Sequence, residues 1–171
     1  MAKALLITRD DIVKKTALGG NVDSDTFIQF VNIAQDTHIQ NYLGSDLLEK
    51  LQALIEAGTV DNVSNAAYKT LLIDYVKPML IHYAMAEYLS FAPYTIANKG
   101  VYKHTSENAE VPSQTEIEKL SEKERQYANH YADRFVDYIC YRTADFPEYN
   151  TNSNGDMYPD SDTSFGGWEL F

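Results

Sequence analysis

Four histidines and one cysteine are the side chains of this sequence best suited to metal binding or nucleophilic chemistry. The histidines are widely separated and form neither an HxxxH nor an HExxH pair, so their spacing matches no common zinc site. They are His38, His82, His104 and His130. His82 and His130 lie among tyrosines at helical spacing, which favours packed core or interface histidines over ligands. Cys140 follows an apolar helical stretch without an obvious activating partner, so we interpret it as a buried small hydrophobe.

Carboxylates gather at the start of the last predicted helix, where they are typical of a solvated face near the positive end of a helix dipole. They are Glu116, Glu118, Glu122 and Glu124. No GxSxG, GxxxxGK(S/T) or GxGxxG motif occurs in the chain, so the usual signatures of hydrolases and nucleotide-binding loops are missing. The residues therefore predict no catalytic, cofactor-binding or metal site.

One stretch near the C-terminus imitates the first half of a calcium-binding loop, with oxygen-bearing side chains at alternate positions and Gly155 at the turn. The alternating residues are Asn150, Asn152, Asn154 and Asp156. Ser161 stands where such loops carry a bidentate glutamate, and no paired helices flank the stretch. A turn-rich linker is the favoured interpretation, and ion binding over residues 150–162 is the alternative left open.

Helical patterns dominate the first 146 residues and would have to position these side chains. The first helix begins after Thr8, whose hydroxyl can cap it, and the last begins at a capping box formed by Ser113 and Glu116. Gly44 is expected to end the second helix, and Pro78 should kink or split the fourth. The expected helices cover about residues 9–18, 24–42, 46–57, 64–91 and 114–142. This pattern predicts a mainly α fold, a helical bundle of about five helices.

Residues 94–112 interrupt the helical pattern. β-Branched and aromatic residues flank Asn98, Lys99 and Gly100, an arrangement typical of a short β-hairpin or a protruding loop. Lys99, Lys103 and His104 make this loop locally basic in an otherwise acidic chain.

The composition excludes several classes of function. The 171 residues include 25 acidic and 14 basic side chains, a formal charge of −11, so the chain should repel nucleic-acid phosphates and anionic membranes. A single cysteine excludes an internal disulfide. No apolar run approaches about 18 residues, and the N-terminus lacks a signal-peptide pattern, so we expect a soluble protein made in a reducing cytoplasm. The chain has thirteen tyrosines and one tryptophan. Tyrosine is favoured where the ring is buried and the hydroxyl reaches solvent, as at protein interfaces, so this surplus indicates interface positions.

The acidity is concentrated at the C-terminal end. From residue 143 onward there are six acidic side chains and no lysine or arginine, so this segment supplies −6 of the −11. We interpret residues 1–146 as the helical domain and residues 147–171 as an extended acidic C-terminal arm. The arm ends in apolar anchors of the kind that docking peptides use: Phe165, Trp168, Leu170 and Phe171. The alternative is that the arm folds back on its own domain.

Five segments carry a resemblance to a known family: LLITRDDI, NYLGSDLLEKL, IDYVKPMLIHYAMAEYLSF, ANKGVYKHTSENAE and YADRFVDYICYRTADFPEY. Together they resemble the head–tail connector, or neck ring, proteins of tailed phages of Bacteroidales hosts, crAss-like phages among them. The resemblance spans roughly residues 5–149 and is most specific at the turn 98–101 and at the closing residues 146–149. The arm from Asn150 onward matches no pattern of that family.

The resemblance implies a helical virion subunit without catalytic activity, assembled in the host cytoplasm into a homo-oligomeric ring, twelvefold, between the portal and the tail. The portal protein and other neck or tail ring proteins would be its partners. Genomic DNA would slide through an acidic lumen without specific binding. The loop 94–112 is expected at the lumen or against the neighbouring ring, through Asn98, Lys99, Gly100, Val101, Lys103 and His104. The arm would clamp an adjacent subunit or ring.

Two other classes stay open on the residues alone. The first is a different structural role in the virion, such as a tail-completion or cargo-associated protein. The second is a small hydrolase or metal-dependent enzyme that uses the oxygen-rich turn near Asn152.

Overall fold

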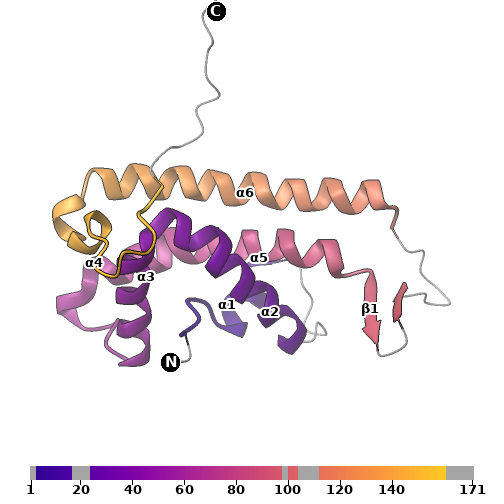
Figure 1. Ribbon diagram of the computed structural model, residues 1–171, viewed down its shortest axis with the longest axis horizontal. Coiled ribbons are helices and arrows are strands. Elements are labelled where there is room, and N and C mark those ends of the chain that lie inside the picture. The colour runs from indigo at the N-terminus through magenta and orange to yellow at the C-terminus, as the bar shows by residue number, and fades with distance from the viewer. Residues whose placement is uncertain (1–2, 17–23, 98–99, 104–111, 161–171) are drawn as a thin grey trace, which may run out of the picture.

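Two long antiparallel helices form the spine of the molecule (Figure 1). The computed structural model describes residues 3–16, 24–97, 100–103 and 112–160. Helix α5 spans Lys77–Phe91 and helix α6 spans Gln114–Cys140. At their contact the Ser121 hydroxyl of α6 donates a hydrogen bond to the carbonyl of Ala86 of α5 at 2.9 Å, and both residues are buried. The fold is therefore mainly helical and built around this pair.

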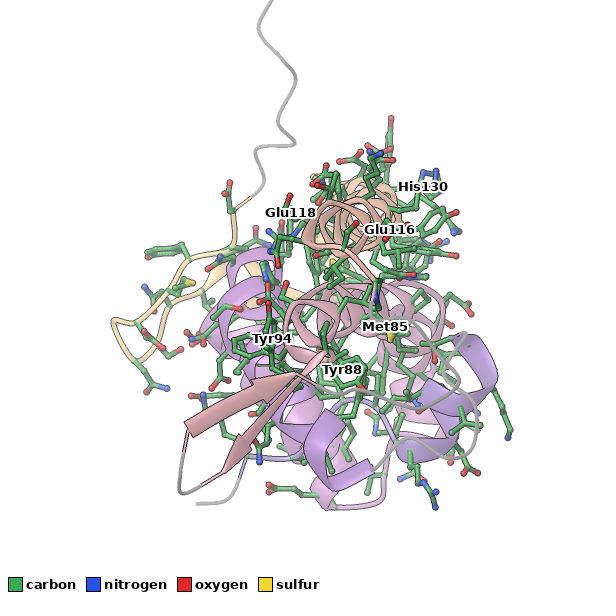
Figure 2. The ribbon with its side chains drawn as sticks, turned by 90° about the vertical axis from the view of Figure 1, so that its right-hand side faces the viewer. Met85, Tyr88, Tyr94, Glu116, Glu118 and His130 are labelled. Atoms are coloured by element: carbon green, nitrogen blue, oxygen red, sulfur yellow. The ribbon has the colours of Figure 1, made fainter. Side chains whose placement is uncertain are left out.

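The remaining helices cover the side of α5 that faces away from α6 (Figures 1 and 2). They are α1 (Arg9–Lys15), α2 (Ser24–Ala34), α3 (Gln40–Glu56) and α4 (Ala66–Thr70), with short helical turns between them. The core lies between these layers. Its largest fully buried side chains include Phe27, Phe135 and Phe146.

The predicted count of about five helices is not found, because α3 continues through a kink at Gly44 instead of beginning after it, and two π-helical turns lie inside stretches that the sequence predicts as plain α-helix. The turn η1 (Gln35–Ile39) runs without a break from α2 into α3. The predicted break at Gly44 is present inside α3 as a kink, with φ 72° and ψ 166° at that residue. This region of backbone conformation is open almost only to glycine.

The second π-helical turn explains how a long helix accommodates Pro78. Helix α4 continues through η3 (Leu71–Val76) into α5, and Pro78 is the second residue of α5. Proline has no N–H to donate and its ring crowds the preceding turn of an α-helix. A wider π turn just before it relieves both problems.

Strands β1 (Tyr94–Ala97) and β2 (Gly100–Lys103) pair antiparallel in the segment between α5 and α6, with Ile96 opposite Val101. The pair lies at the end of the molecule where α5 ends and α6 begins (Figure 1). The Tyr94 hydroxyl donates a hydrogen bond to Oε1 of Gln114 at the start of α6, at 3.4 Å.

The predicted boundary after residue 146 does not separate a packed domain from an unpacked arm. Phe146 is fully buried, and the 3₁₀ turn η5 (Pro147–Asn150) places Tyr149 in the core against Phe135. Burial raises the pKa of Tyr149 to about 12. Residues 151–160 then follow the start of α3. The domain therefore extends to residue 160, and residues 161–171 lie outside the described chain.

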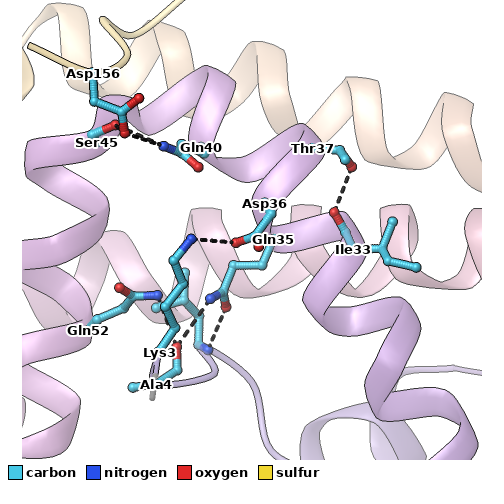
Figure 3. A network of polar contacts seen from close by, with 11 residues as sticks. Lys3, Ala4, Ile33, Gln35, Asp36, Thr37, Gln40, Ser45, Gln52 and Asp156 are labelled. Atoms are coloured by element: carbon cyan, nitrogen blue, oxygen red, sulfur yellow. Dashed lines mark hydrogen bonds and ion pairs between the residues drawn. The ribbon is translucent and has the colours of Figure 1, made fainter. Parts of the chain in front are cut away.

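Two buried glutamines hold the N-terminal residues that precede α1 against the bundle (Figure 3). The backbone N–H of Leu6 donates to Oε1 of Gln35, and Nε2 of Gln35 donates to the carbonyl of Ala4. Gln52 donates to the same carbonyl. Gln35 is 1% exposed, so these hydrogen bonds replace water for a buried amide. Among the described helices, none is long and apolar enough to span a bilayer.

Candidate functional site

A row of stacked polar and aromatic side chains runs along the seam between α6 and the η3–α5 helix. We call it the aromatic ladder. It contains three cations among five rings and consists, in order, of Lys123, Tyr127, His82, Tyr131, Arg134, Tyr75, Tyr138 and Arg142.

The rungs of the ladder lie at stacking distances. The rings of Tyr75 and Tyr138 are 4.2 Å apart with an interplanar angle of 23°, and those of His82 and Tyr131 are 5.5 Å apart and nearly parallel at 6°. The guanidinium of Arg134 lies between two rings, 5.5 Å from that of Tyr75 and 5.7 Å from that of Tyr131. Such cation–ring contacts fix the direction of long side chains that would otherwise be free.

Helix α6 positions the ladder through its own periodicity. Its buried stripe includes Ile117, Ala128 and Phe135. Residues at steps of three and four on one side of that stripe, 120, 123, 127, 131, 134 and 138, share one flank of the helix. The predicted capping box starts the helix in this phase: the Ser113 hydroxyl accepts from the N–H of Glu116, whose carboxylate accepts from the Ser113 N–H.

The two histidines predicted as packed side chains have different surroundings. His82 Nδ1 lies 2.7 Å from Oε2 of Glu124, so its ring is held within the ladder by a carboxylate on α6. His130 is exposed on α6 (Figure 2) and meets the Tyr131 ring edge-on at 5.6 Å. His38 stacks on Tyr83 at 4.2 Å. Each of these three histidine rings therefore packs against a tyrosine ring.

The opposite flank of α6 carries an acidic surface and a hollow. The hollow, of about 270 Å³, lies between the end of α5 and the start of α6. It is lined by Ser90, Gln114, Ile117, Glu118, Ser121, Glu122 and Arg125. Arg125 pairs with Glu87 at 3.5 Å, so its charge is balanced locally.

Beneath this flank, three helices are joined by a partly buried polar cluster. The Tyr83 hydroxyl donates to Oδ1 of Asn129 at 2.8 Å and lies 3.3 Å from the Tyr42 hydroxyl. Burial, together with the contact to Tyr42, raises the pKa of the Tyr83 phenol well above its usual range. His38 Nε2 lies 3.1 Å from Oε1 of Glu87. The cluster fixes the position of α6 relative to α3 and α5.

The segment that imitates a calcium loop, residues 150–156, forms hydrogen bonds with α3 as well as within itself. Asp46 Oδ2 accepts hydrogen bonds from the Thr151 hydroxyl at 2.6 Å and from the N–H and hydroxyl of Ser153. These bonds, that from Thr151 first, lower the pKa of Asp46. Asn154 donates to Glu49, and Asp156 accepts from the Ser45 hydroxyl at 2.6 Å. The sequence analysis did not predict a role for Asp46, because its hydrogen-bond partners lie more than 100 residues away and no neighbouring residue indicates them.

No group of three or more His, Cys, Asp or Glu side chains is placed to hold a metal ion within the described residues. The interpretation of Cys140 as a buried hydrophobe is wrong, since its side chain is exposed. Position 140 lies outside the stripe that buries Phe135 and Ile139, and the apolar neighbours in sequence face another direction.

The structure describes part of the predicted contact residues. Gly100, Val101 and Lys103 belong to strand β2. Asn98, Lys99 and His104 lie outside the described residues, as do the arm anchors Phe165, Trp168, Leu170 and Phe171. The aromatic ladder was missed as a unit, although the surplus of tyrosine and the spacing of positions 127, 131, 134 and 138 were available signals.

Comparison with known proteins gives one match. The model of a family described as a family of unknown function, DUF6712, matches residues 39–158, which run from the end of η1 through α6 into the segment docked on α3. No curated protein and no solved structure matches the chain.

Proposed function

The chain belongs to DUF6712, the family of unknown function whose model covers residues 39–158, and we propose that its role is structural: it is a ring subunit of the neck of a tailed-phage virion. In this proposal the ring joins the portal to the tail and lines the DNA passage. The resemblance of five segments between residues 5 and 149 to neck ring proteins supports the same role.

The observation that carries the proposal is the partly exposed aromatic ladder. Tyr127 within it remains 44% exposed, Leu120 beside it is 55% exposed, and Tyr141 beyond its end is 90% exposed. Aromatic and arginine side chains held rigidly at a surface are the material of protein interfaces, because they bury much area at little cost in conformational entropy. A subunit that assembles would use such a face.

The remaining segments take specific places in the proposal. The β1–β2 pair, which lies at one end of the spine (Figure 1), faces the lumen or the neighbouring ring. The arm from residue 161 binds an adjacent subunit or ring through Phe165, Trp168, Leu170 and Phe171. Its root is held on α3 by the hydrogen bonds to Asp46.

The test is the assembly state of the purified full-length protein, measured by native mass spectrometry and negative-stain electron microscopy. We expect closed rings with about twelve copies, and we expect removal of residues 161–171 to weaken their stacking on portal or on themselves. A protein that stays monomeric at all concentrations, with portal present, contradicts the proposal. Rings that occupy a tail or cargo position in virions would instead support the other structural role.

A further inference from the structure

We propose that the ring contact, which presupposes the ring function above, joins the aromatic ladder of one copy to the acidic flank of α6 in the next copy. The acidic flank consists of Glu118, Glu122 and Asp133, with the hollow beside them. The occupant of the ladder is thus a second copy of this chain.

The two surfaces lie where a ring requires them. A closed ring built by rotation uses two different patches, one on each side of the subunit. At about 100° per residue, the ladder positions and the acidic positions fall on opposite sides of the outer ridge of α6. Figure 2, which looks along α6, shows Glu118 on one side of the helix and Glu116 and His130 on the other.

The charges on the two flanks are opposite in sign, and four of the charged groups form no ion pair within the described residues. Within the described residues, Lys123 and Arg134 form no ion pair and are held over tyrosine rings. Glu122 and Asp133 are exposed and likewise have no cation partner in the described part of the chain. Glu116 lies on the ladder side, but its carboxylate is already bound at the Ser113 cap, which lowers its pKa.

The spacing of these charges matches. Lys123 and Arg134 are separated by the same length of α6 as Glu122 and Asp133, about 16 Å at the helical rise. Rotation about a ring axis parallel to α6 moves a copy sideways without shifting it along the helix. Lys123 then meets Glu122 of the next copy, and Arg134 meets its Asp133, in register.

Shape follows the same register. The exposed Leu120 stands at the level of α6 where the hollow opens on the other flank, between Ile117 and Arg125, and the exposed Tyr127 lies just beyond that level. An apolar or aromatic side chain from the ladder side can enter a hollow of about 270 Å³. One charge pair at the level of this contact and a second about three turns further along α6 would fix its position.

The experiment uses two charge-reversed variants of the full-length chain. Lys123→Glu/Arg134→Glu makes both flanks acidic, and Glu122→Lys/Asp133→Lys makes both basic. Each alone should raise the concentration needed for ring assembly by about tenfold or more, because like charges face each other. An equimolar mixture should assemble again, with the two variants alternating and an even number of copies.

The control is Lys119→Glu/Asp137→Lys, which changes the same charge types on the outer ridge and should leave assembly unchanged. Thermal melting checks that each variant is folded. The single changes Lys123→Glu and Glu122→Lys repeat the test with the Arg134 stacking intact. Rings that tolerate both variants, or a mixture of folded variants that does not assemble, overturn this contact while the ring function stands. A wild-type chain that forms no ring contradicts the proposed function itself.

Discussion

Asp11 joins two helices through one carboxylate. It closes the capping box of α1 with Thr8, and its Oδ2 accepts a hydrogen bond from Lys77 of α5 at 2.7 Å. Partial burial pushes the pKa of Asp11 upward, but the bonds from Lys77 and Thr8 outweigh it and hold the pKa below its ordinary value. The ionised form therefore stabilises the fold.

Asp11→Asn should lower the free energy of unfolding by about 1–2 kcal/mol at neutral pH, through loss of the cap and of the partner of Lys77. Since the pKa is lower in the folded chain, the stabilisation is complete above the unfolded value of about 4. It is lost as the pH falls through the folded value. Urea unfolding between pH 7 and pH 3 should show the gap to wild type shrinking in acid. Asp10→Asn, at an exposed position 4.0 Å from Lys14, should change little; an equal loss there would contradict the role of Asp11.

Gly44 is needed for both its backbone conformation and its lack of a side chain. A Cβ there would lie 2.7 Å from Cδ of Pro159. Gly44→Ala should cost about 2–4 kcal/mol and release the docked segment, seen as faster hydrogen exchange at Asp160, whose N–H donates to Asn41. Gly58→Ala is the control, because its φ is also positive but nothing lies within 4 Å of the added carbon. Gly58→Ala should lower the free energy of unfolding by about 1 kcal/mol. If both variants lose the same free energy, Pro159 moves aside without cost, which contradicts the predicted clash.

The segment 147–160 behaves as an element of the domain, although it contains only one 3₁₀ turn. Tyr149 is buried in the core, and Glu148 accepts a hydrogen bond from the Tyr68 hydroxyl at 2.6 Å and lies 3.6 Å from Lys50. These contacts tie it to α3 and α4. They make the C-terminal root of the arm part of the folded unit.

Truncation separates the root from the arm. Ending the chain after residue 146 should lower the free energy of unfolding by about 2–4 kcal/mol, since a buried aromatic and its neighbours are lost. Ending it after residue 160 should leave the melting temperature close to that of the full chain. Calorimetry on the three chains measures both effects. Equal melting of the 146-residue and 160-residue chains would show that the docked segment contributes no stability.

Over the whole molecule, the distribution of charge bears on how the chain meets DNA. A formal charge of −11 makes close approach to phosphates unfavourable, whereas affinity for DNA normally comes from counterion release by lysine and arginine. In the proposed ring, this repulsion keeps DNA from adhering to the wall. The cations of the aromatic ladder would be covered by the neighbouring copy.

The assembled protein should therefore not retard double-stranded DNA in a mobility-shift assay at about 0.15 M salt. Dissociating the ring with the charge-reversed pair Glu122→Lys/Asp133→Lys, which adds basic groups, gives a comparison in which weak retardation is expected. Tight binding by the wild-type ring would contradict a lumen through which DNA passes freely.

Local signals in the sequence determined the parts of the fold that depend on a few neighbouring residues. The caps at Thr8 and Ser113 and the interruption at Gly44 were predicted and are present. A capping box joins residues only three positions apart, and a positive φ depends on a single glycine, so both can be read from neighbouring residues in the sequence. The helical stripes likewise marked α5 and α6. The two π turns were not predicted from the helical pattern, and only the second of them lies directly before Pro78.

Tertiary structure alone decided which distant residues meet. Tyr75 stacks on Tyr138, Asp46 holds Ser153, and Pro159 covers Gly44, although each pair is separated by more than sixty positions. Such contacts depend on how whole helices pack, which no local pattern encodes. The helical character and acidity of this protein are therefore properties of its sequence, whereas its aromatic ladder and the docking of residues 147–160 arise from the packed bundle.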